Sequence, residues 1–207
     1  MSTTSTYDAF LEACGQQDCP VCRLEHSADL HYLDRLFYEL VNDLGVRQQL
    51  RASLGFCAEH TRMAMDEIQG KALGLAIIYD DLLRVMLEQM AAPRADLSPS
   101  RRCPACDNRD ETTGWVLTEL SKNILQEPLL GALRASQGLC FGHLRQAFEY
   151  LRTPEKRKTL LGVQREIMER LRGELAEYIR KNDYRFTGET FGPERDSWRR
   201  AGKMGRK

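Results

Sequence analysis

The chain has 207 residues, of which 42% are hydrophobic and 29% are charged, a composition typical of soluble globular proteins. Lysine and arginine total 30, as do aspartate and glutamate, so the formal net charge is zero. This balance excludes a chain-wide basic surface for nucleic acid. The length allows one domain or two small ones.

The start of the chain and its most apolar stretch carry no membrane or export signal. Met1 to Tyr7 is polar and lacks the apolar core of a secretory signal. Ala72 to Tyr79 is too short to cross a bilayer. We therefore expect a cytoplasmic protein without membrane contact. In a reducing compartment, its seven cysteines indicate metal or redox chemistry rather than disulfides.

Two motifs each occur twice, in the same order and at nearly the same spacing. Cys-Pro-Val-Cys at 19–22 (the first knuckle) is repeated as Cys-Pro-Ala-Cys at 103–106 (the second knuckle). Segment 50–60, LRASLGFCAEH, is repeated at 133–143 as LRASQGLCFGH, with seven of eleven residues identical. Recurrence of both motifs indicates a tandem duplication.

The duplication suggests a division of the chain. Residues 1–91 form the first helical metal-binding repeat and 103–181 the second, and we expect them to make one compact domain. Segment 92–102 contains two prolines and several polar residues, which is typical of a linker. Helical periodicity stops at 182, so 182–207 is predicted to be an irregular aromatic and basic tail.

Apolar residues of the first copy recur at helical spacing. They predict a helix that follows Cys22 and ends near Asp43, and further helices over 46–53, 57–68 and 72–90. The helix at 72–90 lacks a polar face, which predicts burial in the middle of the fold.

The second copy repeats this order. We predict a helix through Trp115 to Leu125, a short helix from Pro128 and a third helix through Leu144 to Leu151. Thr153 is then an N-cap, with Pro154 at the first position of a long helix. No segment alternates with the two-residue period of a strand. The predicted fold class is all-α.

The cysteines and histidines form two Cys3His sets. The two thiolates of Cys-Pro-x-Cys lie on a tight turn and can face one ion, and the helix that follows favours negatively charged sulfur. A Cys-x-x-His at the start of a helix places both side chains on one face. Three thiolates and one imidazole are a closed tetrahedral set typical of structural zinc. The predicted ligands are Cys19, Cys22, Cys57, His60, Cys103, Cys106, Cys140 and His143.

Two alternatives bear on these sites. We assume that each copy closes its own site, the alternative being an exchange of ligands between the copies. We predict two zinc ions, with an iron–sulfur cluster on the same ligands as the alternative, because histidine in place of one cysteine favours zinc. A thioredoxin-like redox pair is disfavoured because no βαβ pattern surrounds the motifs.

Other residues fit a structural role better than a ligand role. Cys14 has no counterpart in the second copy and is predicted to be a structural thiol, with a spare ligand or redox-sensitive thiol as the alternative. His26 and His31 also lack counterparts and are predicted to be surface or packed side chains. Arg51 and Arg134 recur beside the metal motifs, either to hydrogen-bond a thiolate or carbonyl or simply because their size fits.

The chain resembles an uncharacterised family of prokaryotic proteins, filed as a domain of unknown function, with two CPxC…CxxH units. The resemblance covers nearly the whole chain, tail included. It implies a bacterial or archaeal cytosolic protein and supports the metal motifs, but it implies no activity or partner. The residues that carry it are the knuckles, Tyr32-Leu33-Asp34 to Val46-Arg47, Gly55-Phe56-Cys57, His60, Asp183-Tyr184-Arg185-Phe186 and Asp196-Ser197-Trp198.

Full ligand sets leave no open coordination position for a substrate. We therefore predict a non-enzymatic adaptor, in which two structural zinc sites rigidify a helical body that binds another protein. An iron–sulfur redox or electron-transfer protein and a thiol or metal sensor are the alternatives. The tail would dock the partner, and its deletion should leave the metal content intact. The docking residues would be Tyr184, Phe186, Phe191 and Trp198.

Nucleic-acid binding is a further alternative for the tail, which ends in a group of basic residues. A basic chain end is more often a solvated segment than a binding site, so a protein partner is the preferred prediction. The basic residues are Arg199, Arg200, Lys203, Arg206 and Lys207.

Overall fold

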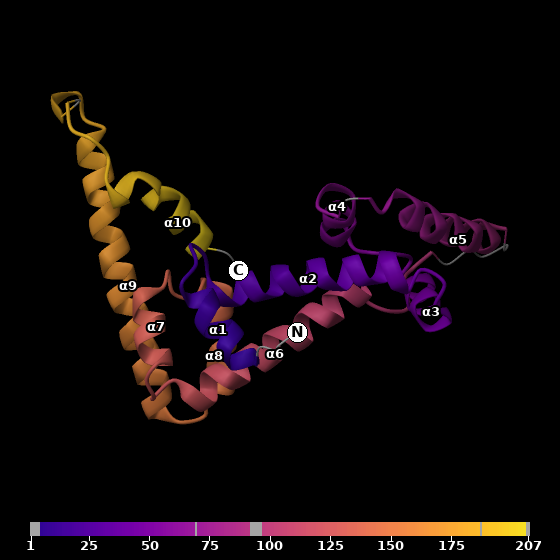
Figure 1. The fold of residues 1–207 in the computed structure, drawn as a ribbon, viewed down its shortest axis with the longest axis horizontal. Coiled ribbons are helices and arrows are strands. Elements are labelled where there is room, and N and C mark those ends of the chain that lie inside the picture. Colours follow the sequence, from indigo (N-terminus) through magenta and orange to yellow (C-terminus); the bar gives the residue numbers. More distant parts are fainter. Residues whose placement is uncertain (1–4, 69, 92–96, 187, 206–207) are drawn as a thin grey trace. The chain divides into compact units, whose positions relative to one another are not determined.

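The computed structural model describes residues 5–68, 70–91, 97–186 and 188–205. Within these ranges all regular structure is helical, which confirms the all-α class (Figure 1). The α-helices are α1 (Thr6–Cys14), α2 (Pro20–Glu39), α3 (Leu44–Ala52), α4 (Ala58–Asp66), α5 (Ala72–Met90), α6 (Pro104–Asn123), α7 (Leu129–Ala135), α8 (Phe141–Tyr150), α9 (Pro154–Lys181) and α10 (Ser197–Met204). Two 3-10 turns, Tyr184–Phe186 and Pro193–Asp196, precede α10.

Local sequence signals explain several helix ends. The Asp43 side chain caps α3 by accepting a hydrogen bond from the backbone N–H of Val46 at 2.8 Å, and α2 has already ended at Glu39. Thr153 caps α9, with Pro154 at its first position, as predicted. Both knuckles open a helix, because each proline is the first residue of α2 or α6.

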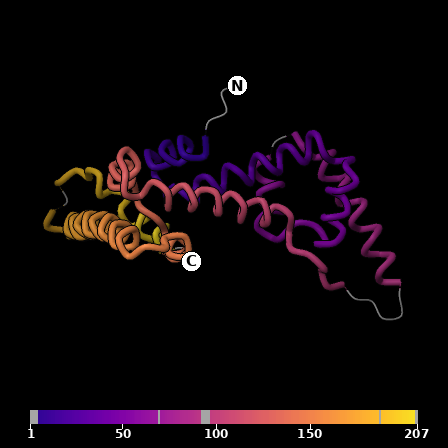
Figure 2. The backbone as a smooth tube through the Cα atoms, turned by 90° about the horizontal axis from the view of Figure 1, so that it is seen from below, coloured from indigo at the N-terminus to yellow at the C-terminus, as the bar shows by residue number. Residues whose placement is uncertain are grey.

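The chain divides into two compact units. Unit 1 comprises Met1–Leu24 and Thr113–Lys207, and unit 2 comprises Glu25–Thr112. The boundaries fall inside α2 and α6, so each of these helices begins in one unit and ends in the other; both can be followed in the tube of Figure 2. The compact units therefore do not coincide with the two sequence copies.

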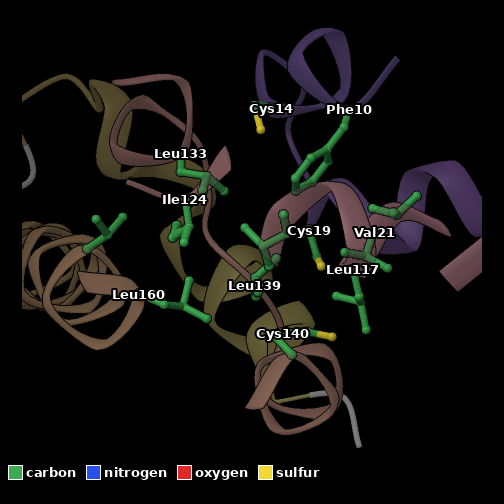
Figure 3. Close-up of a cluster of buried hydrophobic side chains, with 14 of the residues drawn as sticks. Phe10, Cys14, Cys19, Val21, Leu117, Ile124, Leu133, Leu139, Cys140 and Leu160 are labelled. Carbon is green, nitrogen blue, oxygen red and sulfur yellow. The ribbon is translucent and has the colours of Figure 1, made fainter. Parts of the chain in front are cut away.

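The core of unit 1 is built from α1 and the helices of the second copy. Phe10 of α1, Leu133 of α7 and Leu160 of α9 have at most 1% of their surface exposed, and Figure 3 shows them facing the same interior. Burial of each such side chain contributes about 1.5–3 kcal/mol. Helix α7 contacts both α1 and α9, and so connects the first helix of the chain with the long helix of the second copy.

The core of unit 2 lies between α2, α3, α4 and α5. Leu36 of α2 and Leu50 of α3 are buried with Ile78 of α5, and the rings of Phe37 and Phe56 meet edge to face at 6.0 Å. Gly74 lets α5 approach α2 closely, because a Cβ there would lie 2.9 Å from a backbone oxygen of α2.

The predicted burial of α5 is wrong. Only Gly74, Ile78, Asp81 and Leu82 are buried, whereas large apolar side chains elsewhere on the helix face solvent. Leucine content alone could not distinguish the two faces, because both carry leucine. The exposed side chains are Leu73, Leu83, Leu87 and Met90, with 74%, 57%, 66% and 56% of their surface accessible.

The predicted irregular tail is also partly wrong, because residues 197–204 form α10, which packs on α9. Both apolar contacts and ion pairs fasten this segment, and Met204 and Ala201 pack with the core of unit 1. Arg200 contacts Glu174 of α9, and Lys181 of α9 lies 2.6 Å from the buried Glu194. Apolar periodicity is therefore a poor indicator of order in so short and charged a segment.

Candidate metal centres

Centre 1 lies in unit 1 and consists of Cys19, Cys22, Cys140 and His143. The three sulfurs lie 3.5, 3.3 and 3.2 Å, in that order, from the Nδ1 atom of His143. The sulfurs of Cys22 and Cys140 are 3.7 Å apart. All four ligand atoms lie within 4.8 Å of one another, and Cys22 alone is half-buried while the other three side chains are buried.

Centre 2 lies in unit 2 and consists of Cys57, His60, Cys103 and Cys106. The sulfurs of Cys57, Cys103 and Cys106 lie 3.1, 3.6 and 3.5 Å from Nδ1 of His60. The Cys57 and Cys106 sulfurs are 3.7 Å apart. His60 has no exposed surface, so its ring position is fixed by its surroundings.

The assumed pairing within each copy is wrong, and the ligands are exchanged. Each knuckle meets the Cys-x-x-His of the other copy. Helix length explains this outcome: the 20 residues of α2 carry the chain about 30 Å from the first knuckle. Helix α3 has nine residues and spans about 14 Å, so on its own it cannot bring Cys57 back to Cys22.

The ligand positions fit one tetrahedral ion in each centre. With metal–sulfur and metal–nitrogen bonds of about 2.3 and 2.0–2.1 Å, tetrahedral geometry requires sulfurs about 3.8 Å apart and sulfur–nitrogen distances of about 3.5 Å. The sulfur–sulfur distances of 3.7 Å and sulfur–nitrogen distances of 3.1–3.6 Å agree with these edges. Both sets could therefore hold a metal ion without rearrangement of the backbone.

The Cys-x-x-His half of each centre has the same local conformation. Cys57 is the N-cap of α4 with φ −66° and ψ 166°, and Cys140 is the N-cap of α8 with φ −65° and ψ 161°. Neither thiol makes a side-chain capping hydrogen bond. Each sulfur is therefore directed to its centre, while the adjacent helix start favours its negative charge.

A glycine turn and a buried glutamine position Cys140. Gly138 has φ +73°, the left-handed region that favours glycine. Gln164 of α9, 2% exposed, accepts a hydrogen bond from Leu139 N–H at 3.0 Å and donates one to Leu139 C=O at 2.9 Å. Gln164 therefore clamps the residue that precedes the ligand. No motif marks Gln164 in the sequence, because an amide on an apolar helix face belongs to none.

The thiols of a centre do not ionise alike. Burial raises the pKa of Cys103 but hydrogen bonding to His60 and backbone N–H groups outweighs it, so the pKa falls to about 6. Burial and the Cys103 thiolate raise the pKa of Cys106 to about 12. In centre 1, hydrogen bonds with Cys19 and Cys22 lower the pKa of Cys140, whereas burial raises that of Cys19. A bound cation would favour ionisation of all three thiols together.

A charged network behind His60 is the main feature that sequence analysis missed. Nε2 of His60 lies 3.3 Å from Oδ1 of Asp29, which is completely buried. The guanidinium of Arg109 lies 2.6 Å from Asp29 Oδ2 and 3.0 Å from Glu59. With Nδ1 facing the sulfurs, Nε2 faces both the Asp29 carboxylate and an Arg109 nitrogen 3.0 Å away; a carboxylate is the usual outer-shell partner of a metal-bound histidine. The apolar neighbour Leu33, one turn after Asp29, was the available signal that Asp29 faces inward.

Burial lowers the pKa of the His60 imidazole, but the contacts with Asp29 and with the sulfurs of Cys103 and Cys57 raise it to about 10. The surroundings of this ring therefore favour a positive charge. The same surroundings would stabilise a metal cation bound at Nδ1.

The remaining candidates lie outside both centres. Cys14 is 3% exposed and burial raises the pKa of its thiol to about 12, which suits a structural thiol. His26 is exposed and 3.2 Å from Glu67, and His31 is exposed too. Arg51 donates two 2.7 Å hydrogen bonds to Asp81, and Arg134 lies 3.3 Å from Glu166. The suggested support of a thiolate by these arginines is thus replaced by ion pairs between helices.

The four tail aromatics differ in their exposure and in their contacts. Tyr184 is 83% exposed and Trp198 is 51% exposed. Phe186 lies under the guanidinium of Arg180 at 4.5 Å, and Phe191 is 5.5 Å from the ring of Tyr178. Two of these aromatics therefore fasten the tail to α9, and two face solvent.

Comparison with known proteins identifies a family whose function is unknown. The model of a family of unknown function, DUF6062, matches residues 2–127. The chain belongs to this family. The match includes both knuckles and the Cys57–His60 pair but ends before Cys140 and His143, so it is shorter than the nearly full-length resemblance expected from the sequence.

A bacterial relative covers more of the chain. An uncharacterised 23.9 kDa protein in the xynA 3′ region of Caldicellulosiruptor sp. (strain Rt8B.4) is 28% identical over 180 residues, which span 84% of this chain and 87% of that protein. No solved structure matches this DUF6062 protein. None of its described helices has the combination of length and apolarity that a membrane span requires.

Proposed function

We propose that this DUF6062 protein is a cytoplasmic, zinc-stabilised helical binding protein whose two metal centres are structural. The observation that supports the proposal is the completeness of both ligand sets: four protein atoms converge in each centre, which leaves no coordination position for a substrate. Structural zinc sites contribute on the order of ten kcal/mol to folding. The metals would thus determine whether the helical body forms at all.

Ligand spacing and type both support a single zinc ion in each centre. The ligands of an iron–sulfur cluster bind different irons around an inorganic core, whereas these ligand atoms lie within 4.8 Å of one another. The histidine in each set also favours zinc over a cluster. The free thiols of both sets suit a reducing compartment.

Elemental analysis with an absorption spectrum tests this assignment. The purified protein should contain two zinc ions per chain and be colourless, because the filled d shell of zinc has no visible transitions. His143→Ala, which removes a centre 1 ligand, should lower the zinc content toward one ion. The exposed His31→Ala is the control and should retain both ions. Iron with visible absorption would contradict the proposal.

We place the contact with a partner protein on the exposed aromatics of the tail. Tyr184 and Trp198 present large apolar surfaces to solvent, and such side chains carry much of the binding energy at protein interfaces. Nucleic acid is the weaker candidate partner, because Arg200 and Lys203 already pair with Glu174 and Asp18.

Capture from cell lysate tests the tail surface. The double variant Tyr184→Ala/Trp198→Ala should lose a protein that the parent chain retains, with both zinc ions still present. Tyr38→Ala is a matched control, because Tyr38 is 77% exposed in unit 2 and lies outside the tail. Equal capture by the double variant would rule out docking through these residues.

A further inference from the structure

Helix α5 carries a solvent-exposed apolar stripe on the face opposite the core of unit 2. Gly74, Ile78 and Leu82 bury the other face in unit 2. The stripe residues follow alternating steps of three and four, the spacing of a helix that packs along a second helix. They are Leu73, Ala76, Asp80, Leu83, Leu87 and Met90, all exposed.

Unit 1 carries an apolar groove between α8, α9 and α10. Its volume is 530 Å³, within the range of sites that accept large ligands or side-chain clusters. Phe141, Leu161 and Met168 line it with 46%, 49% and 38% of their surfaces exposed. The other apolar lining residues are Leu144, Leu171, Leu175, Ala201 and Met204.

The charges beside the stripe and the groove are complementary. Asp80 and Glu88 accompany the stripe, and both are exposed. Arg165 and Arg172 belong to the groove lining together with Glu169, so two arginines against one glutamate leave the lining net positive. At 1.5 Å per residue, the two acids are about 12 Å apart along α5 and the two arginines about 10.5 Å apart along α9. The i,i+4 pairs Arg84–Glu88 and Arg165–Glu169 are exposed and can exchange partners at little cost.

We propose that the stripe of one copy of this chain docks in the groove of a second copy. This occupant explains Asp80, the charged residue within the stripe. If two α5 helices paired in parallel, the Asp80 side chains would face each other, and an antiparallel pair centred on the stripe would set Asp80 against Leu83. In the groove, Arg172 is available to receive the carboxylate. The inference is independent of the proposed partner protein.

Sedimentation of the full-length, zinc-loaded protein tests the contact. We expect the average mass to rise above that of one chain with concentration. Leu83→Glu in the stripe and Leu161→Glu in the groove should each abolish this rise. An equimolar mixture of the two variants should regain a two-copy species, because one intact stripe and one intact groove remain. Leu44→Glu, at a 76% exposed site outside both surfaces, should behave as the parent chain.

Other outcomes overturn the proposal. A chain that stays monomeric at all concentrations contradicts it. Loss of association in Leu83→Glu but not in Leu161→Glu would indicate stripe-to-stripe pairing instead. The zinc content of every variant is measured in parallel, so a failed metal centre is distinguished from a failed contact.

A charge exchange tests the proposed orientation. Asp80→Arg should weaken association by about threefold to tenfold, and adding Arg172→Asp in the same chain should restore it. No recovery in the double variant would contradict the pairing of these two residues.

Discussion

At the residue scale, a buried carboxylate that belongs to neither ligand set lies beside centre 2. Asp29 contacts both His60 and Arg109, and its carboxylate would favour the tautomer of the imidazole that leaves Nδ1 for the metal. Removal of such an outer-shell partner typically costs 10–100-fold in metal affinity. Asp29 is thus expected to act through His60 as a positioning residue.

Asp29→Asn should accelerate zinc loss from centre 2 by about 10–100-fold, because the side chain keeps its shape but loses its charge. Competition with a coloured chelator would show one fast and one unchanged phase of release. Asp66→Asn, an exposed position on α4, serves as the control. Identical release from the parent chain and Asp29→Asn would show that the carboxylate does not support the metal.

Gly138 and Gly162 should respond in opposite directions to alanine. Gly138 has φ +73° and its added Cβ would lie 2.9 Å from Gln164, so Gly138→Ala should destabilise the protein by about 1 kcal/mol or more. Gly162 lies within α9, with nothing within 4 Å of its Cβ position. Gly162→Ala should stabilise by about 0.5–1 kcal/mol. Urea denaturation of the zinc-loaded protein measures both changes, and equal signs would contradict this reading of the turn.

At the element scale, α10 covers one side of centre 1. A small cleft is lined jointly by Cys19 and Cys140 of the centre and by Arg200, Lys203 and Met204 of α10. The Lys203 ammonium lies 3.1 Å from Asp18, the residue before Cys19. The tail therefore adjoins a metal centre, a relation that the sequence analysis did not anticipate.

Truncation at residue 191 should accelerate zinc release from centre 1 by severalfold while leaving centre 2 unchanged, since α10 no longer shields the Cys19 and Cys140 sulfurs. This replaces the expectation that loss of the tail leaves the metal unaffected. Centre 2 is an internal control in the same chelator assay. Unaltered release in both phases would show that α10 does not protect the metal.

Local sequence signals predicted where helices begin better than they predicted which side chains are buried. Thr153-Pro154 located the start of α9, because capping depends on a few adjacent residues. The exposure of α5 could not be predicted in the same way, since Leu82 is buried and Leu83 exposed, and only the packing partners distinguish them. Helix α10 was not predicted, because only a few residues of so short a helix, among them Ala201 and Met204, make apolar contacts, and ion pairs with α9 also hold it.

At the scale of the whole molecule, each metal centre joins segments far apart in sequence. Residues 118 positions apart meet in centre 1, through Cys22 and Cys140, and residues 49 apart meet in centre 2, through Cys57 and Cys106. Closing the longer loop costs about 0.8 kcal/mol more chain entropy. The sequence predicted the ligand types, the helical class and the long helix after Cys22, but the pairing depends on the directions in which successive helices run, which no motif records.

The exchange of ligands between copies is the central claim, and cysteine footprinting of His60→Ala tests it directly. After brief alkylation, mass spectrometry should find Cys103 and Cys106 modified, while Cys19 and Cys22 stay protected in centre 1. His143→Ala should give the reverse pattern. Modification of Cys19 and Cys22 in His60→Ala, with Cys103 and Cys106 protected, would mean that each copy closes its own site and would contradict the exchanged pairing.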